Sequence, residues 1–370
     1  MRRENWSMAI ELNRDLTYTE TIEQDYVFLT KAGIPLADRD LVSFHPKSQR
    51  LELVEAYVIR PDGTRIDVPE SARFTRPSAA SQETPGFSGS ETTTVLFPQL
   101  EVGSRTHVVW RVTQVRPSVL GFNVAVRPLL EWPTRHMALT ITAPADLVLR
   151  FAQRGGFAVA EQVSDGRRRI TASIDDVAAQ QREPEMVSAS DFQPLFVATS
   201  LPDLAMLGAI YHRQAADRAS VTPAIRAVAE RIAADKSGLE AARAIHDWVA
   251  ANIRYVAVYL DPSDGWVPHA AEDVLARGYG DCKDHIALLQ ALLAARGIKA
   301  EAALVDWGNR YQPFPLGMPQ EFNHVIAWLP EYGLFANPTN PFARLGSLDR
   351  RLAGKLAVIA NEVGEVVHTP

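Results

Sequence analysis

The stretch G-Y-G-D-C-K-D-H, residues 278–285, is followed at once by the apolar run I-A-L-L-Q-A-L-L-A-A, residues 286–295. Together they predict a helix over residues 282–296, because Asp281 can cap its first turn and Gly297 can end it. Gly278 and Gly280 allow a close backbone approach just before this helix. The sequence therefore places Cys282, the only cysteine of the 370 residues, at a helix N-terminus.

A thiol in the first turn of a helix lies at the positive end of the helix dipole, which favours the thiolate. Lys283 acts in the same direction, whereas Asp281 and Asp284 oppose it, and the sequence does not decide the balance. One cysteine forms no intramolecular disulfide, so the thiol is buried, reactive or paired with another chain. A free cysteine is most often a small core residue. Here its neighbours are glycines and charged residues, which favours a nucleophile whose apparent pKa lies well below about 8.5.

A cysteine nucleophile requires a base, and the base requires a group that orients it. His324 is our candidate base, because the segment F-N-H-V-I-A-W-L (322–329) alternates as a strand does. A hairpin closing around residues 330–333 places Asn337 on the face of His324, where the amide accepts from the imidazole; a register slip of one residue places it on the other face. The alternatives are a hydrogen-bonded core histidine and a turn asparagine.

Two other histidines lie close in sequence. His285 follows Cys282 on the same helix, which leaves little room for a substrate between them, so we expect it to support the site at most. His269 is expected in a surface loop. Cys282, Asp284 and His285 lack the spacing and the second cysteine of a zinc site, so we expect no metal. The sequence contains no P-loop, G-x-S-x-G elbow or G-x-G-x-x-G motif.

The chain is expected to contain two domains, residues 1–195 and 196–370. Short strands with Pro-Asp-Gly (61–63) and Asp-Gly (165–166) turns predict an antiparallel β-sandwich in the first, with a loop over residues 76–95. Helical periodicity after residue 195, including a Thr222-Pro223 helix start, is followed by strands at 299–305, 322–329 and 334–337. This order indicates an α+β domain, with a helix packed on an antiparallel sheet.

The segment Y-G-D-C-K-D-H-I-A-L-L-Q-A-L-L-A-A-R-G-I-K-A-E-A-A-L-V (279–305), then F-N-H-V-I-A-W-L and N-P-T (337–339), resembles the core of bacterial transglutaminase-like proteins, which has a papain-like fold. Three upstream segments resemble the DUF3857 domain that often precedes this core: G-I-P-L-A-D-R-D (33–40), L-E-L-V-E-A-Y-V-I-R-P-D-G (51–63) and L-F-P-Q-L-E-V-G-S (96–104).

The resemblance implies that Cys282 is the nucleophile and His324 the base. Asn337 stands where the family usually has aspartate; a neutral amide orients the imidazole but stabilises its charged form less. Trp266, in D-G-W-V-P-H (264–269), is implied as an oxyanion donor. The expected function is acyl transfer on peptide or side-chain amides through a Cys-His-Asn triad, giving a protease, a deamidase or a crosslinking enzyme without a cofactor. The alternative is a weakly active or inactive fold that binds a protein or peptide.

The composition argues against some classes of partner. A net charge of −6 argues against nucleic acid, and no apolar run is long enough to span a membrane. The first residues show no signal peptide, which predicts a cytoplasmic protein as the sequence stands, or a periplasmic or secreted one if an upstream leader was lost. The sequence leaves open the substrate, the oligomeric state and the choice between hydrolysis and transamidation.

Overall fold

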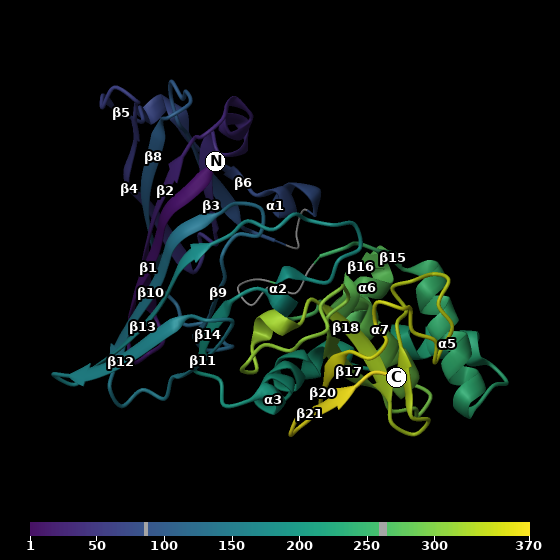
Figure 1. Cartoon of the computed structure of the whole chain (residues 1–370). Coiled ribbons are helices and arrows are strands. Elements are labelled where there is room, and N and C mark those ends of the chain that lie inside the picture. The colour runs from purple at the N-terminus through teal and green to yellow at the C-terminus, as the bar shows by residue number, and fades with distance from the viewer. Residues whose placement is uncertain (85–87, 259–264) are drawn as a thin grey trace. The chain divides into compact units, whose positions relative to one another are not determined.

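The computed structural model describes residues 1–84, 88–258 and 265–370, which form two compact units, Met1–Ser200 and Leu201–Pro370 (Figure 1). The first unit is built mainly from strands, and the second combines helices with a sheet. Among the described residues, we find no helix with the length and apolar character that crossing a membrane requires.

The first unit contains one large sheet and two small ones. In sheet order the large sheet is β12 (Ala158–Ser164), β13 (Arg167–Val177), β10 (Thr134–Pro144), β1 (Arg2–Leu12), β2 (Tyr18–Val27), β8 (Arg105–Gln114), β4 (Gln49–Ile59) and β5 (Arg65–Asp67). The small sheets are β11 (Arg150–Arg154), β14 (Leu195–Thr199) and β9 (Asn123–Val126), and β3 (Arg39–Phe44), β7 (Glu91–Leu96) and β6 (Arg73–Pro77). Two short helices, α1 (Ala79–Glu83) and α2 (Ala189–Phe192), complete the unit.

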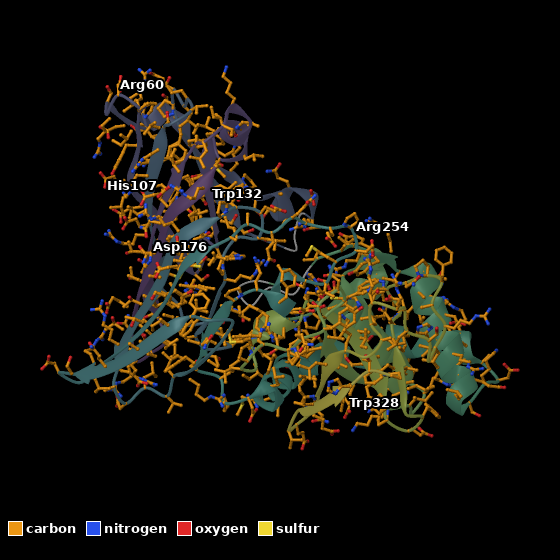
Figure 2. All side chains as sticks on the ribbon, in the orientation of Figure 1. Arg60, His107, Trp132, Asp176, Arg254 and Trp328 are labelled. Atoms are coloured by element: carbon orange, nitrogen blue, oxygen red, sulfur yellow. The ribbon has the colours of Figure 1, made fainter. Side chains whose placement is uncertain are left out.

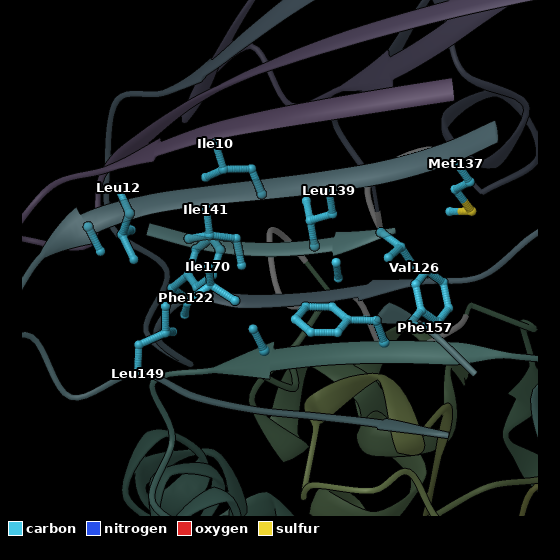
Figure 3. Packing of buried hydrophobic residues seen from close by; sticks show 14 residues of the cluster. Ile10, Leu12, Phe122, Val126, Met137, Leu139, Ile141, Leu149, Phe157 and Ile170 are labelled. Carbon is cyan, nitrogen blue, oxygen red and sulfur yellow. The ribbon is translucent and has the colours of Figure 1, made fainter. Parts of the chain in front are cut away.

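Strands β8 and β10 alternate buried side chains with more exposed ones, so the large sheet has one apolar face. On β10, Met137, Leu139 and Ile141 are buried in this way. They pack with side chains of β1, β13 and the small sheet β11-β14-β9 in one cluster, which Figure 3 shows between the layers of strands. A second cluster, around Trp110 of β8 and Val95 of β7, packs the large sheet against β3-β7-β6. The sandwich architecture predicted for this half is confirmed.

Three details differ from the sequence prediction or refine it. The pairs of the described sheets in this unit are antiparallel as predicted, apart from β1 with β10, which run parallel. The loop predicted over 76–95 is wrong in part, because α1 and β7 lie within it; its residues 85–87 are outside the described residues. β14 begins at the predicted domain boundary and pairs with β11 and β9 of the first unit. Both predicted glycine turns are present, with positive φ at Gly63 and Gly166.

The second unit is α+β, as predicted. Its helices are α3 (Leu204–Ala215), α4 (Pro223–Ala233), α5 (Gly238–Asn252), α6 (Ala271–Arg277) and α7 (Cys282–Ala294). An antiparallel sheet has the order β19 (Leu334–Ala336), β18 (His324–Leu329), β17 (Glu301–Val305), β20 (Leu356–Ala360) and β21 (Glu365–His368). Strands β15 (Arg254–Tyr255) and β16 (Tyr279–Gly280) form a short parallel pair, and β16 directly precedes α7 in the chain.

Helix α7 is the central element of this unit. It packs against α4, α5 and α6 and against strands β17 and β18. Its apolar run is buried all round, from Ile286 to Leu293, as expected for a helix enclosed by other elements. The helix carries the first residue of the candidate site, Cys282, at its N-terminus.

Candidate active site

The N-terminus of α7 is held by a reciprocal pair of aspartates. The Asp281 side chain accepts the backbone N–H of Asp284 at 3.1 Å, and Asp284 Oδ2 accepts the backbone N–H of Asp281 at 3.4 Å. This capping box fixes where the helix begins, and so fixes Cys282 in the first turn. Gly280 is required beside it: a Cβ at this position would lie 2.6 Å from the Cβ of Asp284. The close backbone approach expected at Gly280 is therefore present, and Asp284 is the residue that it approaches.

His324 is the first residue of β18, the strand that packs beside α7. The backbone N–H of Val325, the next residue, is directed at the sulfur of Cys282. The base predicted from the sequence therefore lies one residue from a direct contact with the thiol. The structure brings together two residues that are 42 positions apart in the sequence.

Asn337 lies beside the imidazole, as the predicted hairpin requires. Strands β18 and β19 pair in the register Leu329–Leu334 and Ala327–Ala336, which closes the hairpin at residues 330–333. Asn337 Oδ1 lies 3.2 Å from His324 Nε2 and accepts the Thr339 hydroxyl at 2.7 Å. Because an amide oxygen only accepts, Nε2 carries the proton and Nδ1 is left with its lone pair. The Asn337 amide nitrogen is buried and has no partner among the described residues.

The three residues are almost completely buried: Cys282 is 0%, Asn337 1% and His324 2% exposed. Burial is the main reason that the pKa of Cys282 is raised to about 12, with Asp281 adding to the effect. Burial also lowers the pKa of His324 to about 4, although the contact with Asn337 acts the other way. The free protein therefore holds a neutral thiol and a neutral imidazole. The expectation of a low thiol pKa is wrong for this state.

The charged residues around the thiol are paired with each other. Lys283 forms a buried ion pair with Asp281; burial lowers the pKa of Lys283, but Asp281 together with Cys282 and Asp284 outweighs this effect and the pKa is raised. Asp284 accepts from Arg277 at 2.6 Å and contacts His269 Nδ1 at 3.1 Å. The charges that the sequence left in balance are thus largely paired with each other or with Arg277 and His269, and burial is the largest influence on the thiol pKa.

His285 and His269 have other tasks. The His285 ring nitrogens lie 2.8 and 3.1 Å from the backbone oxygens of Asp281 and Ile253, and the single N–H of the neutral ring donates to one of them. His285 ties the start of α7 to the residue before β15, in the supporting position expected for it. His269 was expected in a surface loop; its side chain is partly exposed, but it also braces the buried Asp284.

Trp266 was predicted as an oxyanion donor. Its indole nitrogen is buried and has no hydrogen-bond partner among the described residues. Its ring lies 5.6 Å, edge to face, from Tyr211 of α3. Burial, followed by the electrostatic interaction with Cys282, raises the pKa of Tyr211 well above its ordinary value, which indicates that this tyrosine lies near the thiol. Sequence reasoning missed Tyr211, because in L-A-M-L-G-A-I-Y-H it reads as an ordinary residue of an apolar helix.

Two further aromatic residues flank His324. The Trp307 ring lies 4.5 Å from the imidazole, and the Tyr255 ring lies 6.4 Å from it in an edge-to-face arrangement. Both line a cavity of about 510 Å³, and His324 is part of its wall. The other lining residues are Ala257, Asn323, Asp349, Arg350 and Arg351. This volume falls in the range of about 300–1,000 Å³ that is usual for ligand sites.

Among the described residues, one group of side chains with the proximity that a metal site needs lies in the first unit. Ligand atoms of Glu23, Asp25 and His107 lie within 4.8 Å of one another; His107, on β8, is labelled in Figure 2. His107 Nδ1 is 2.7 Å from Asp25, and its Nε2 is 3.6 Å from Glu55. The hydrogen bond with Asp25 is the main reason that the pKa of His107 is raised. The His107 contacts with Asp25 and Glu55 are those of an ion-pair cluster, which these side chains form with each other.

Two families match the chain. DUF3857, described as a domain of unknown function with a solved structure, matches residues 14–181, and the transglutaminase-like superfamily matches residues 226–330. The chain thus contains a region that matches DUF3857 followed by a region that matches the transglutaminase-like superfamily. The second match includes Cys282 and His324, whereas Asn337 lies just beyond it. The chain has no match among curated proteins.

A solved structure shares this architecture. The match with the crystal structure of a "putative protease" from Parabacteroides distasonis ATCC 8503 spans 100% of this chain and 71% of that chain, with a TM-score of 0.81 and 17% identity. That likeness shows the fold alone. A "putative cysteine protease" from Cytophaga hutchinsonii (14% identity, 67% of this chain and 84% of that one, TM-score 0.27) is too dissimilar to inform the site. An M1 zinc metallopeptidase from Deinococcus radiodurans is also too dissimilar (12% identity, 80% of this chain and 64% of that one, TM-score 0.28).

Proposed function

We propose that this transglutaminase-like protein is a cysteine acyl-transfer enzyme that acts on peptide or side-chain amides, with Cys282 as nucleophile, His324 as base and Asn337 as the group that orients the base. The observation that carries the proposal is the contact between Asn337 Oδ1 and His324 Nε2, combined with the Val325 N–H directed at the Cys282 sulfur. These two contacts support the order of nucleophile, base and orienting group that acyl transfer requires.

The neutral resting pair defines how the reaction begins. The Cys282 thiol transfers its proton to His324 Nδ1 as the sulfur attacks the carbonyl carbon, so the charged pair forms only with the tetrahedral intermediate. His324 then gives this proton to the leaving nitrogen, the C–N bond breaks and a thioester remains on Cys282. Water or an amine attacks the thioester, His324 accepts its proton, and the thiol is regenerated.

The developing oxyanion requires donors that are not already in use. We assign the indole N–H of Trp266 to this role, because it is buried and unpartnered among the described residues. The contact of Trp266 with Tyr211, which itself lies near Cys282, supports this assignment. Trp266→Phe keeps the ring but removes the donor. Loss of one such donor lowers kcat by roughly 10²–10³-fold in other enzymes.

Activity on an amide-peptide library tests the proposal, with release of ammonia or of a new amine as the readout. Wild-type protein should react, and Cys282→Ala and His324→Gln should not. Release of ammonia indicates deamidation, a new peptide end indicates proteolysis, and joined peptides indicate crosslinking.

A second function, a non-catalytic module that binds a protein or peptide, is favoured by one observation. The thiol has no exposed surface and a raised pKa in the free protein. In that case library peptides bind equally well to the wild-type protein and to Cys282→Ala, and neither protein changes them.

A further inference from the structure

The cavity next to His324 carries an excess of positive charge. Arg350 and Arg351 line it and are exposed, and neither guanidinium pairs with a carboxylate among the described residues. Asp349, the acidic residue of the same lining, uses its Oδ1 to accept the backbone N–H of Arg351 at 2.9 Å. The two arginines are therefore available to a ligand.

The opposite part of the lining is aromatic and held in place. Tyr255 belongs to β15, which pairs with β16 directly before the cysteine helix. The Trp307 backbone N–H donates to Asn323 Oδ1 at 2.7 Å, and the Asn323 amide donates to Asp306 at 3.1 Å. A cavity with apolar walls and a few convergent polar groups is typical of a site for a small group or a single residue.

The chemistry of the proposed function determines which part of a substrate occupies this cavity. His324 must donate its proton to the leaving nitrogen, so the leaving amine has to lie against the imidazole. Because His324 is part of the cavity wall, the substrate group attached to that amine extends into the cavity. The same place receives the attacking water or amine in the second half of the reaction.

We propose that the enzyme selects substrates whose leaving amine carries a carboxylate, bound by Arg350 and Arg351 with its aliphatic part against Tyr255 and Trp307. This rests on the proposed function. The carboxylate belongs either to an acidic side chain or to the free end of the peptide chain, since guanidinium groups bind both in the same way. The arginines are exposed, so we expect a preference of roughly 3- to 10-fold in kcat/KM that weakens as salt is added.

Four peptide pools test this, identical except at the residue after the amide that is attacked. That residue is Glu with an amidated end, Gln with a free carboxylate end, Gln with an amidated end, or Lys with an amidated end. Wild-type protein should prefer one or both of the first two pools, which separates a side-chain from a terminal carboxylate. Arg350→Ala/Arg351→Ala should bring the ratio to the Gln-amide pool close to one, and Arg350→Glu/Arg351→Glu should favour the Lys pool.

Arg344→Ala is the matched control, because Arg344 is an exposed arginine of the same segment that does not line the cavity. It should keep the wild-type ratio. Binding of the same pools to Cys282→Ala, measured by competition and mass spectrometry, gives a readout independent of turnover. Equal use and equal binding of all pools, or an equal loss in Arg344→Ala, would overturn the inference while Cys282-dependent turnover persists. Absence of turnover with retained binding of the carboxylate pools would instead refute the proposed function alone.

Discussion

Asn337 is the position where a substitution most sharply tests how the base works. Asn337→Ala removes the acceptor of both the His324 N–H and the Thr339 hydroxyl. Each buried group left without a partner costs about 1–3 kcal/mol, partly offset because the unpartnered amide nitrogen is removed as well. Without the acceptor the imidazole is free to turn or to change tautomer, so we expect kcat/KM to fall at least roughly tenfold.

Asn337→Asp keeps the acceptor and adds a negative charge beside the imidazole. A carboxylate at this distance raises a histidine pKa by about 1–3 units. The pKa of His324, about 4 in the wild type, should therefore rise to roughly 5–7. The acid limb of the pH–kcat/KM profile should move to higher pH by the same amount, while activity at pH 8 stays much closer to wild type than in Asn337→Ala.

The pKa is measured independently of activity by NMR titration of histidine ring signals, with His324→Gln to assign the His324 resonance. Circular dichroism checks that each variant is folded. The orienting role would be wrong if aspartate proved as damaging as alanine in a folded protein. It would also be wrong if the His324 pKa were the same in the wild type and in Asn337→Asp.

Three other predictions concern the same unit. Iodoacetamide should label Cys282 slowly at neutral pH, and the rate should still be rising above pH 10, because the thiol pKa is about 12; a plateau near neutral pH would contradict the neutral pair. Gly280→Ala should lower the free energy of unfolding by about 1–3 kcal/mol in urea, since its Cβ would meet Asp284; Gly280 has no positive φ, so the loss reports this contact alone. Between pH 6.5 and 4, protonation of His324 favours the unfolded chain, because its folded pKa lies below the ordinary value. The contribution of this histidine to stability is thus full above pH 6.5 and falls as the pH drops. Between pH 6.5 and 4 the free energy of unfolding of His324→Gln, measured in urea at each pH, should fall by about 3 kcal/mol less than that of wild type. Equal losses would refute the low pKa.

Much of the site was predictable because local rules determine it. Capping residues and a C-terminal glycine set the ends of α7, and strand alternation with a short turn set the face on which Asn337 lies. These rules act over a few residues, so a single sequence contains the information. The same is true of the Gly63 and Gly166 turns in the first unit.

Other features depend on packing between distant segments and were not predictable. The thiol pKa was misjudged because the sequence reveals the helix dipole and the neighbouring charges, but not complete burial under other elements. Tyr255 reaches His324 through the pairing of β15 with β16, which no local pattern indicates. The parallel pairing of β1 with β10 is equally non-local. By contrast, β7 was missed although its run E-T-T-T-V-L is rich in β-branched residues, a local signal that the surrounding serines and prolines outweighed.

The central claim is that Cys282 forms a covalent acyl intermediate with an amide substrate. Intact-protein mass spectrometry after rapid acid quenching of a reaction with the amide-peptide library tests it most directly. We predict a mass increase equal to the acyl part of a peptide, located on Cys282, present in wild type and absent in Cys282→Ala. Amide turnover that persists in Cys282→Ala, or no adduct and no turnover in the folded wild-type protein across the library, would contradict the account.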